Sequence, residues 1–314
     1  MLIISTFLKN FSKNNEINRI IHGLCKASII ISQSIQNDKY KPEKISLNVG
    51  GDIQKPLDLF SDKTLLDYLN IDEVAAYCSE EQKGITNLNH NGEYIVVTYP
   101  LYGSSNIESN VTIGTIFSVI PRNGLSIQDA IYQKGCKQSC SGFFVYGPKT
   151  TLILTFKEGT HSFFLNYNSN NFELLNKDIS IPIETSEYSI NSSYKRHWNE
   201  SVSNYIKNCE LGKDGPRKRD FNMRWVGALV ADASRIFSRG VIFLYPQDKR
   251  KTNINGRLRL TYEANPIALL IEEAGGKASD GVGDILKKKV IDIHQRTPLI
   301  FGSKEEVDTF LNTE

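Results

Sequence analysis

Hydrophobic positions in the first part of the chain recur with the period of an α-helix. Across residues 16–35, isoleucine and leucine side chains return every three or four positions, which predicts an amphipathic helix with one face against a core. Residues 57–69 predict a second helix. Between them, residues 48–52 hold two adjacent glycines and predict a turn.

The middle of the chain changes to runs of β-branched and aromatic residues. These runs predict strands because such side chains suit a pleated, half-buried surface. They cover residues 93–98, 111–120, 143–147, 151–156, 161–165 and 172–175.

After a predicted boundary at residues 178–183, helical and strand patterns alternate. We expect helices at residues 225–237 and 266–274 and a strand at residues 240–245; the second helix begins at a proline and is followed by two glycines. The alternation predicts an α/β or α+β fold with an N-terminal domain over residues 1–178 and a C-terminal domain over residues 179–314.

Composition narrows the classes of function. The 314 residues include 37 basic and 35 acidic side chains, a net charge of +2, and 40% are hydrophobic. This balance is typical of a globular protein with a sizeable core and disfavours a nucleic-acid partner, which requires concentrated positive charge. The five cysteines are scattered and fit neither a disulfide framework nor a zinc site. Apolar runs fall short of the ~20 residues of a membrane span, so we expect no membrane partner and a cytoplasmic location.

Three sets of residues could carry chemistry. The turn Gly103-Ser104-Ser105 follows a predicted strand and could hold a phosphate, although plain turns favour the same residues. Carboxylates from separate segments could bind Mg²⁺, which prefers oxygen ligands, or could be solvated surface charges; they are Asp52, Asp58, Glu80, Glu81 and Glu263.

The third set is basic. Arg217, Lys218, Arg219 and Arg224 precede a second group, Lys249, Arg250, Lys251, Arg257 and Arg259. Such runs commonly form a solvated face, but arginines near Asn191, Tyr194 and Tyr245 could bind a phosphate and a sugar. The sequence contains no P-loop or dinucleotide fingerprint.

These residues lie in motifs that resemble class I fructose-1,6-bisphosphatase. The resemblance runs in order over nearly the whole chain. Its motifs include Gly51-Asp52-Ile53-Gln54-Lys55, Ser79-Glu80-Glu81, Gly103-Ser104-Ser105-Asn106, Val226-Gly227-Ala228-Leu229-Val230-Ala231-Asp232, Phe243-Leu244-Tyr245-Pro246 and Ile293-His294-Gln295-Arg296.

The resemblance implies a layered α/β/α/β/α sugar-phosphatase fold, a homotetramer, and Mg²⁺-dependent hydrolysis of the C1 phosphate of fructose 1,6-bisphosphate in gluconeogenesis. It implies metal binding by Glu80, Glu263 and the Leu101 carbonyl, and catalytic roles for Asp52, Asp58 and Glu81. It further implies that Gly103, Ser104 and Ser105 bind the C1 phosphate, that Asn191, Tyr194, Tyr245 and Arg257 bind the 6-phosphate and sugar, and that Arg224 reaches a neighbouring subunit.

One departure from the family's D-P-L-D-G-S-S turn bears directly on activity. The chain has Tyr99 and Tyr102 at the two aspartate positions. A phenol has a pKa near 10 and is neutral where Mg²⁺ favours a carboxylate. We therefore expect very low or no hydrolysis. The alternatives are an active phosphatase with a rearranged site, and a silent member that binds sugar phosphate or partners with an active homologue.

Overall fold

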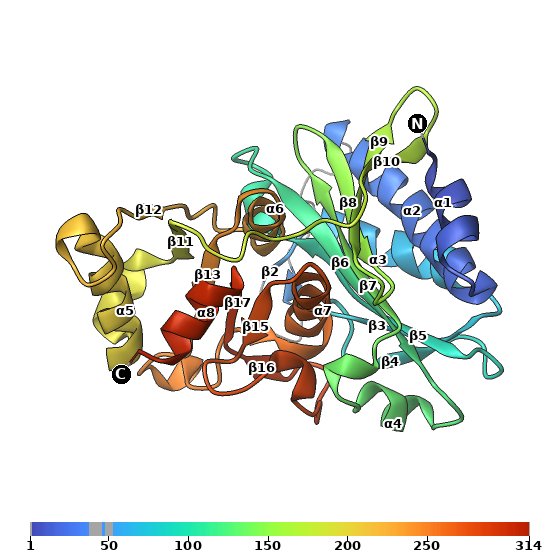
Figure 1. Ribbon diagram of the computed structural model, residues 1–314. Coiled ribbons are helices and arrows are strands. Elements are labelled where there is room, and N and C mark those ends of the chain that lie inside the picture. The colour runs from blue at the N-terminus through green and yellow to red at the C-terminus, as the bar shows by residue number, and fades with distance from the viewer. Residues whose placement is uncertain (1, 38–45, 48–52, 314) are drawn as a thin grey trace.

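Five layers of helices and sheets make up the molecule, which confirms the predicted α/β class and α/β/α/β/α layering. The computed structural model describes residues 2–37, 46–47 and 53–313. An eight-stranded and a five-stranded sheet form the β layers, with helices beside and between them (Figure 1). Two short antiparallel pairs accompany the sheets: β1 (Ser46–Leu47) with β2 (Ile53–Gln54), and β14 (Leu258–Arg259) with β16 (Arg296–Thr297).

The larger sheet has the strand order β10-β9-β8-β7-β6-β5-β3-β4. Its neighbouring strands are antiparallel except for the parallel pair β3–β5. The strands are β3 (Val74–Ser79), β4 (Ile85–Asn87), β5 (Tyr94–Tyr102), β6 (Ile113–Pro121), β7 (Cys140–Tyr146), β8 (Thr150–Thr155), β9 (Thr160–Asn166) and β10 (Asn171–Asn176).

Three helices cover the outer face of this sheet: α1 (Ile4–Phe11), α2 (Asn15–Gln36) and α3 (Pro56–Leu69). Helix α2 corresponds to the helix predicted at residues 16–35, and it begins where the Asn14 side chain accepts hydrogen bonds from the Glu16 and Ile17 N–H groups. Its buried isoleucines pack on the sheet as the periodicity predicted. Among the described helices, none has the length and apolar character of a membrane span.

The smaller sheet has the strand order β12-β11-β13-β17-β15. Each of its two faces packs against a different hydrophobic core. Along β13, Phe243 faces a core with α6 and α7, whereas Ile242 and Leu244 face a core with α5 and α8, as expected for a strand buried on both sides. These strands are β11 (Glu187–Ile190), β12 (Asn222–Met223), β13 (Ile242–Tyr245), β15 (Lys277–Ser279) and β17 (Leu299–Gly302); the helices are α5 (Glu200–Glu210), α6 (Leu229–Arg239), α7 (Asn265–Glu273) and α8 (Lys304–Leu311).

Helices α6 and α7 lie between the two sheets (Figure 1). Buried residues of both helices pack against Ile116 and Phe143 of the larger sheet and Phe301 of the smaller one. A further short helix, α4 (Ile127–Ile131), packs near β5 and β6. The division of the chain into domains 1–178 and 179–314 stays a prediction.

The prediction of a helix over residues 225–237 is wrong at its N-terminal end, because α6 begins only at Leu229. Gly227 has a φ of +84°, a left-handed conformation that interrupts a helix. The N–H groups of Val226 and Gly227 instead donate to the buried Asp232 carboxylate. The turn predicted at residues 48–52 lies outside the described residues.

Candidate functional site

The parallel pair β3–β5 brings the acidic pair Glu80 and Glu81 beside the altered turn. Ser79, the last residue of β3, pairs with Thr98 of β5, and the Glu80 N–H donates to the Thr98 carbonyl at 3.2 Å. Carboxyl ends of parallel strands meet at one edge of a sheet, where ligand sites commonly lie. Glu80 therefore lies beside Tyr99, the next residue along β5, and Glu80 is 3% exposed.

Tyr99 and Tyr102 lie on either side of a break in the β5–β6 register. Tyr99 pairs with Ile116 and Tyr102 with Gly114, so the regular ladder is interrupted at Pro100 and the buried Leu101. Such bulges redirect side chains. The two tyrosine rings meet edge to face with centroids 4.9 Å apart, and Tyr99 meets Tyr262 in the same manner at 5.8 Å.

Carboxylates surround both phenols. Burial raises the pKa of the Tyr99 hydroxyl well above its usual value, and the charges of Glu80 and Glu263 raise it further. Burial likewise raises the pKa of Tyr102, with a further rise from Glu263. Both side chains are therefore neutral at physiological pH. Glu263 lies in the π-helical turn Leu260–Ala264, where its carboxylate accepts the Arg259 N–H at 2.6 Å.

Two further predicted catalytic acids lie in the same region. Burial, followed by the neighbouring Glu80, raises the pKa of Glu81 to about 8, although Gln54 donates to its carboxylate at 2.6 Å. Burial raises the pKa of Asp58 to about 6; its carboxylate accepts the Lys55 N–H at 2.7 Å at the start of α3. Asp52, the remaining member of the predicted set, lies outside the described residues.

These donors do not fit Mg²⁺. The ion prefers anionic oxygen ligands in near-octahedral geometry, whereas Tyr99 and Tyr102 present neutral phenols and aromatic rings. Across residues 2–37, 46–47 and 53–313, no group of three or more Asp, Glu, His or Cys side chains is placed to hold a metal ion.

The Gly103-Ser104-Ser105 segment forms the expected turn directly after β5. Gly103 has a φ of +82°, which favours glycine, and Ser104–Asn106 is a single 3-10 turn. The Ser104 hydroxyl lies near Asp58, where its hydrogen bond lowers the pKa of that carboxyl against the larger effect of burial. The turn therefore lies next to one of the predicted catalytic acids.

A second parallel pair, β11–β13, builds a pocket from the predicted sugar-phosphate residues. Ile190 pairs with Leu244, so Asn191 and Tyr245 leave the two strands side by side. The four predicted residues Asn191, Tyr194, Tyr245 and Arg257 all line this pocket. Arg257 donates to the Tyr194 hydroxyl at 3.0 Å, so the structure brings together a guanidinium, two phenols and an amide from three separate segments of the chain.

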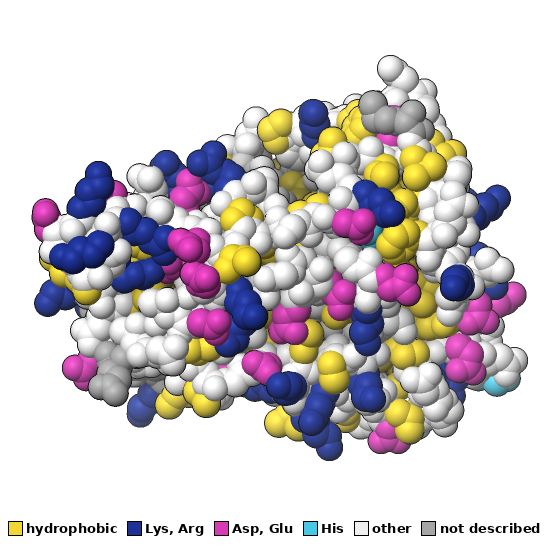
Figure 2. Space-filling model, in the orientation of Figure 1, with side chains coloured by type: hydrophobic (Ala, Val, Ile, Leu, Met, Phe, Trp, Pro, Cys, Tyr) yellow, Lys and Arg dark blue, Asp and Glu magenta, His cyan; other side chains and the backbone are white. Residues whose placement is uncertain are grey.

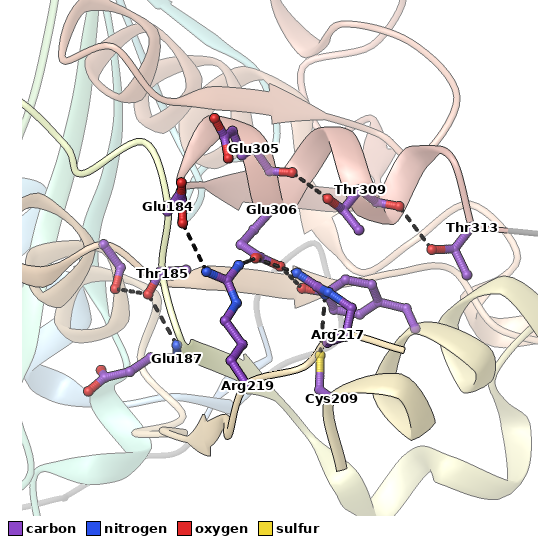
Figure 3. A network of polar contacts seen from close by, with 12 residues as sticks. Glu184, Thr185, Glu187, Cys209, Arg217, Arg219, Glu305, Glu306, Thr309 and Thr313 are labelled. Atoms are coloured by element: carbon purple, nitrogen blue, oxygen red, sulfur yellow. Dashed lines mark hydrogen bonds and ion pairs between the residues drawn. The ribbon is translucent and has the colours of Figure 1, made fainter. Parts of the chain in front are cut away.

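Arginines of the basic set separate into two groups. Arg217 and Arg219 both bind the buried Glu306 carboxylate, and Arg219 also reaches Glu184 at 3.1 Å (Figure 3). Arg224 is exposed and lies 3.8 Å from Glu187 rather than lining the pocket. Figure 2 shows Lys and Arg side chains gathered at the left end of the molecule, over α5 and β12. Arg217 and Arg219 thus stabilise the fold by pairing with Glu306.

The sequence analysis placed Arg250 in the basic set without a contact of its own and assigned no site role to Asp248. The Arg250 guanidinium lies 4.1 Å from the centroid of the Tyr194 ring, and that of Arg257 lies 4.9 Å from it. Asp248 has a side chain 2% exposed and binds Arg250 and Asn253, which fixes this loop. The Asp248-x-Arg250 spacing was the available signal, because a carboxylate and an arginine two residues apart can pair within a turn.

An aromatic platform adjoins the pocket. Trp225 stacks on Phe243 with centroids 5.5 Å apart and on Tyr245 at 6.0 Å, with interplanar angles of 14° and 10°. Phe243 and Tyr245 lie two residues apart on β13 and so share a face. Tyr245 belongs both to this platform and to the pocket lining.

Comparison with known proteins agrees with the fold and covers nearly the whole chain. The family model for the "Fructose-1-6-bisphosphatase, N-terminal domain" matches residues 2–177, and that for the C-terminal domain matches residues 181–313. The chain belongs to the class 1 fructose-1,6-bisphosphatase family. The predicted resemblance is thereby confirmed.

Relatives in this family are similar over most of their length. The chain is 46% identical to a class 1 fructose-1,6-bisphosphatase of Azorhizobium caulinodans over 288 residues, covering 91% of this chain and 88% of the relative. It is 47% identical to one of Pseudoalteromonas atlantica, covering 85% and 84%. The crystal structure of the Leishmania major fructose-1,6-bisphosphatase in holo form superposes with a TM-score of 0.92 at 31% identity, covering 98% and 97%.

Proposed function

We propose that this fructose-1,6-bisphosphatase family member binds a sugar phosphate and hydrolyses it very slowly or not at all. The observation that carries the proposal is the edge-to-face pair Tyr99–Tyr102 among Glu80, Glu81 and Glu263. The family is generally Mg²⁺-dependent. A divalent ion at this turn would meet two neutral phenols in place of two anionic ligands, so it would be held weakly where it is needed to stabilise the attacking water oxygen and the leaving sugar oxygen.

The sugar-phosphate part of the site supports binding. Arg257 and Tyr194 are hydrogen-bonded at the pocket wall, and Asn191 and Tyr245 complete a lining that offers donors to a phosphate. The second candidate, an active phosphatase with a rearranged site, is favoured by the buried Glu80, Glu263 and Asp58 that remain. We rank it lower because the loss of about 3 kcal/mol of transition-state stabilisation already slows a reaction by more than about a hundredfold.

We also propose, from family membership, a homotetramer in the cytoplasm, with Arg224 reaching a neighbouring subunit. Arg224 is suited to this because it is exposed and its contact with Glu187 is long, at 3.8 Å. Under this proposal, an active homologue rather than this chain catalyses the family's reaction in gluconeogenesis.

Phosphate release from fructose 1,6-bisphosphate tests the proposal, with Mg²⁺ and then Mn²⁺. The wild type is compared with the double variant Tyr99→Asp/Tyr102→Asp and with Tyr99→Phe/Tyr102→Phe, which keeps the rings and removes only the hydroxyl groups. We expect no phosphate release by the wild type or the phenylalanine variant, and phosphate release by the aspartate variant. Turnover by the wild type would overturn the proposal, and a folded but inactive aspartate variant would show that the tyrosines are not the cause.

A further inference from the structure

Three asparagine–glycine pairs occur in the chain: Asn91-Gly92, Asn123-Gly124 and Asn255-Gly256. Asparagine is a thermally labile residue, and it is most reactive before glycine, because a residue without a Cβ lets its backbone nitrogen approach the asparagine side chain. All three asparagines are exposed to solvent, so exposure alone does not distinguish them. The surroundings of the three glycines differ.

Two of the pairs are held in place by hydrogen bonds and packing. The Gly92 N–H donates to the Asn89 carbonyl at 2.9 Å. The Gly256 N–H donates to the Asn253 carbonyl at 3.1 Å. Both glycines are buried: a Cβ on Gly92 would lie 2.4 Å from the backbone of β3, and one on Gly256 would lie 2.2 Å from the backbone of β16. Neither peptide can rotate toward its asparagine side chain without breaking these contacts.

The third pair forms an open turn between β6 and α4. Asn123 and Gly124 have φ values of +49° and +78°, as in the type I′ turn that asparagine–glycine pairs favour. The Leu125 N–H closes the turn on the Arg122 carbonyl at 3.0 Å. The Gly124 N–H has no acceptor among the described residues, and beyond its chain neighbours no atom lies within 4 Å of a Cβ built on Gly124. Nothing in the fold blocks rotation of this peptide.

We propose that Asn123 is a site of spontaneous deamidation and that the fold directs the modification to it. The Gly124 nitrogen loses its proton to a solvent base and attacks the side-chain carbonyl carbon of Asn123. The new N–C bond closes a cyclic imide, and the side-chain nitrogen takes up a proton and leaves as ammonia. Water then opens the ring at either carbonyl carbon, which yields aspartate or isoaspartate. The reaction needs only water and does not depend on the proposed function.

Arg122 connects this turn to the start of β5. Its guanidinium donates to the His90 and Gly92 carbonyls, both at 2.9 Å, and to the Leu125 carbonyl at 3.2 Å. Isoaspartate lengthens the main chain of the turn by a methylene group, which displaces the Leu125 carbonyl from Arg122. The modification therefore adds a negative charge and weakens a contact at the start of the strand that ends at Tyr102.

Peptide mass spectrometry tests the proposal on the purified full chain, aged in heavy-oxygen water at mildly alkaline pH and digested in ordinary water. Heavy oxygen enters every asparagine that passes through the imide, so the rates at the three pairs are compared within one sample. We expect Asn123 to be modified at least about tenfold faster than Asn91 or Asn255, which corresponds to a barrier lower by about 1.4 kcal/mol. Asn123→Gln should lose this signal, since a glutamine side chain closes such a ring far more slowly.

The same chain unfolded in guanidinium chloride is the matched control. Unfolding removes the hydrogen bonds and packing at Gly92 and Gly256, so we expect the three rates to agree within a few-fold. Modification of Asn91 or Asn255 as fast as Asn123 in the folded chain would overturn the proposal, as would a folded chain in which none of the three reacts. An equal lead of Asn123 in the folded and unfolded chains would assign the order to local sequence and overturn the role of the fold.

Discussion

The rings of Tyr99 and Tyr102 meet edge to face at 4.9 Å, on either side of the bulge in β5. Edge-to-face pairs contribute roughly 0.5–1.5 kcal/mol beyond the burial of their area. Tyr262 extends the contact through Tyr99 at 5.8 Å. The same two side chains that remove anionic ligands from the turn therefore also join it to the segment that carries Glu263.

This packing predicts that Mg²⁺ stabilises an aspartate variant of the turn and leaves the stability of the wild type unchanged. Tyr99→Asp/Tyr102→Asp replaces packed rings by carboxylates near Glu80 and Glu263. Without metal, we therefore expect its free energy of unfolding to be about 3 kcal/mol lower than that of the wild type. Saturating Mg²⁺ should restore about 2.7 kcal/mol at a hundred times its Kd. Thermal unfolding with and without Mg²⁺ measures both effects.

The wild type and Tyr99→Phe/Tyr102→Phe serve as controls for that experiment. Both keep the aromatic contact and lack the added carboxylates, so we expect their melting temperatures to be unchanged by Mg²⁺. A rise in the melting temperature of the wild type with Mg²⁺ would contradict the conclusion that its donor set does not fit the ion.

Arg250 predicts a second effect, on ligand affinity. Its guanidinium lies over the ring of Tyr194, which lines the pocket with Asn191, Tyr245 and Arg257, and it is fixed by the buried Asp248, so it holds this wall of the pocket in place. We expect Arg250→Gln to weaken fructose 6-phosphate binding about tenfold. Titration calorimetry measures the change. Arg239→Gln is the matched control, since Arg239 is an exposed arginine bound to Glu187; an equal loss in both variants would argue against a specific role for Arg250.

Local sequence patterns predicted helices and strands correctly where local interactions determine the secondary structure. The helix expected at residues 16–35 is observed as α2, because the apolar stripe and the Asn14 cap agree. The strand expected at residues 93–98 continues through Pro100 to Tyr102, since a bulge accommodates the proline. The start of α6 was placed too early because the periodicity gave no sign of the left-handed Gly227.

The site was predictable only in part, because strand pairing and ion-pair partners depend on residues far apart in the chain. Asn191, Tyr194, Tyr245 and Arg257 meet because β11 and β13 are parallel neighbours, which spacing alone does not determine. Arg217 and Arg257 look alike in the sequence. In the structure, Arg217 forms an ion pair with the buried Glu306, whereas Arg257 donates a hydrogen bond to Tyr194 at the pocket.

Glu306 predicts a third effect, on stability. Its side chain is 1% exposed and accepts hydrogen bonds from Arg217, Arg219 and the Tyr205 hydroxyl, the last at 2.7 Å (Figure 3). Glu306→Gln removes the charge that these arginines neutralise, so we expect a loss of roughly 3–5 kcal/mol in the free energy of unfolding. Urea denaturation measures it.

An exposed ion pair provides the comparison for Glu306. Glu210 lies 3.3 Å from Lys195, and both side chains are largely solvent-exposed. Exposed pairs contribute about 0–1 kcal/mol, so Glu210→Gln should be nearly neutral. Similar losses in the two variants would mean that the buried network adds nothing beyond a surface pair.

The raised pKa of Glu81 predicts a fourth effect, on the pH dependence of stability. Burial and Glu80 move this pKa from 4.5 to about 8 in the folded protein, so between these values the folded state holds a proton that the unfolded state has lost. Linkage then requires the contribution of Glu81 to stability to fall as pH rises through this window. Because Glu81→Gln cannot titrate, its stability relative to the wild type should increase from pH 5 to pH 8.5. Urea unfolding in EDTA measures the difference. A difference that stays constant with pH would mean that Glu81 keeps an ordinary pKa in the folded chain, and that it is charged beside Glu80 at neutral pH.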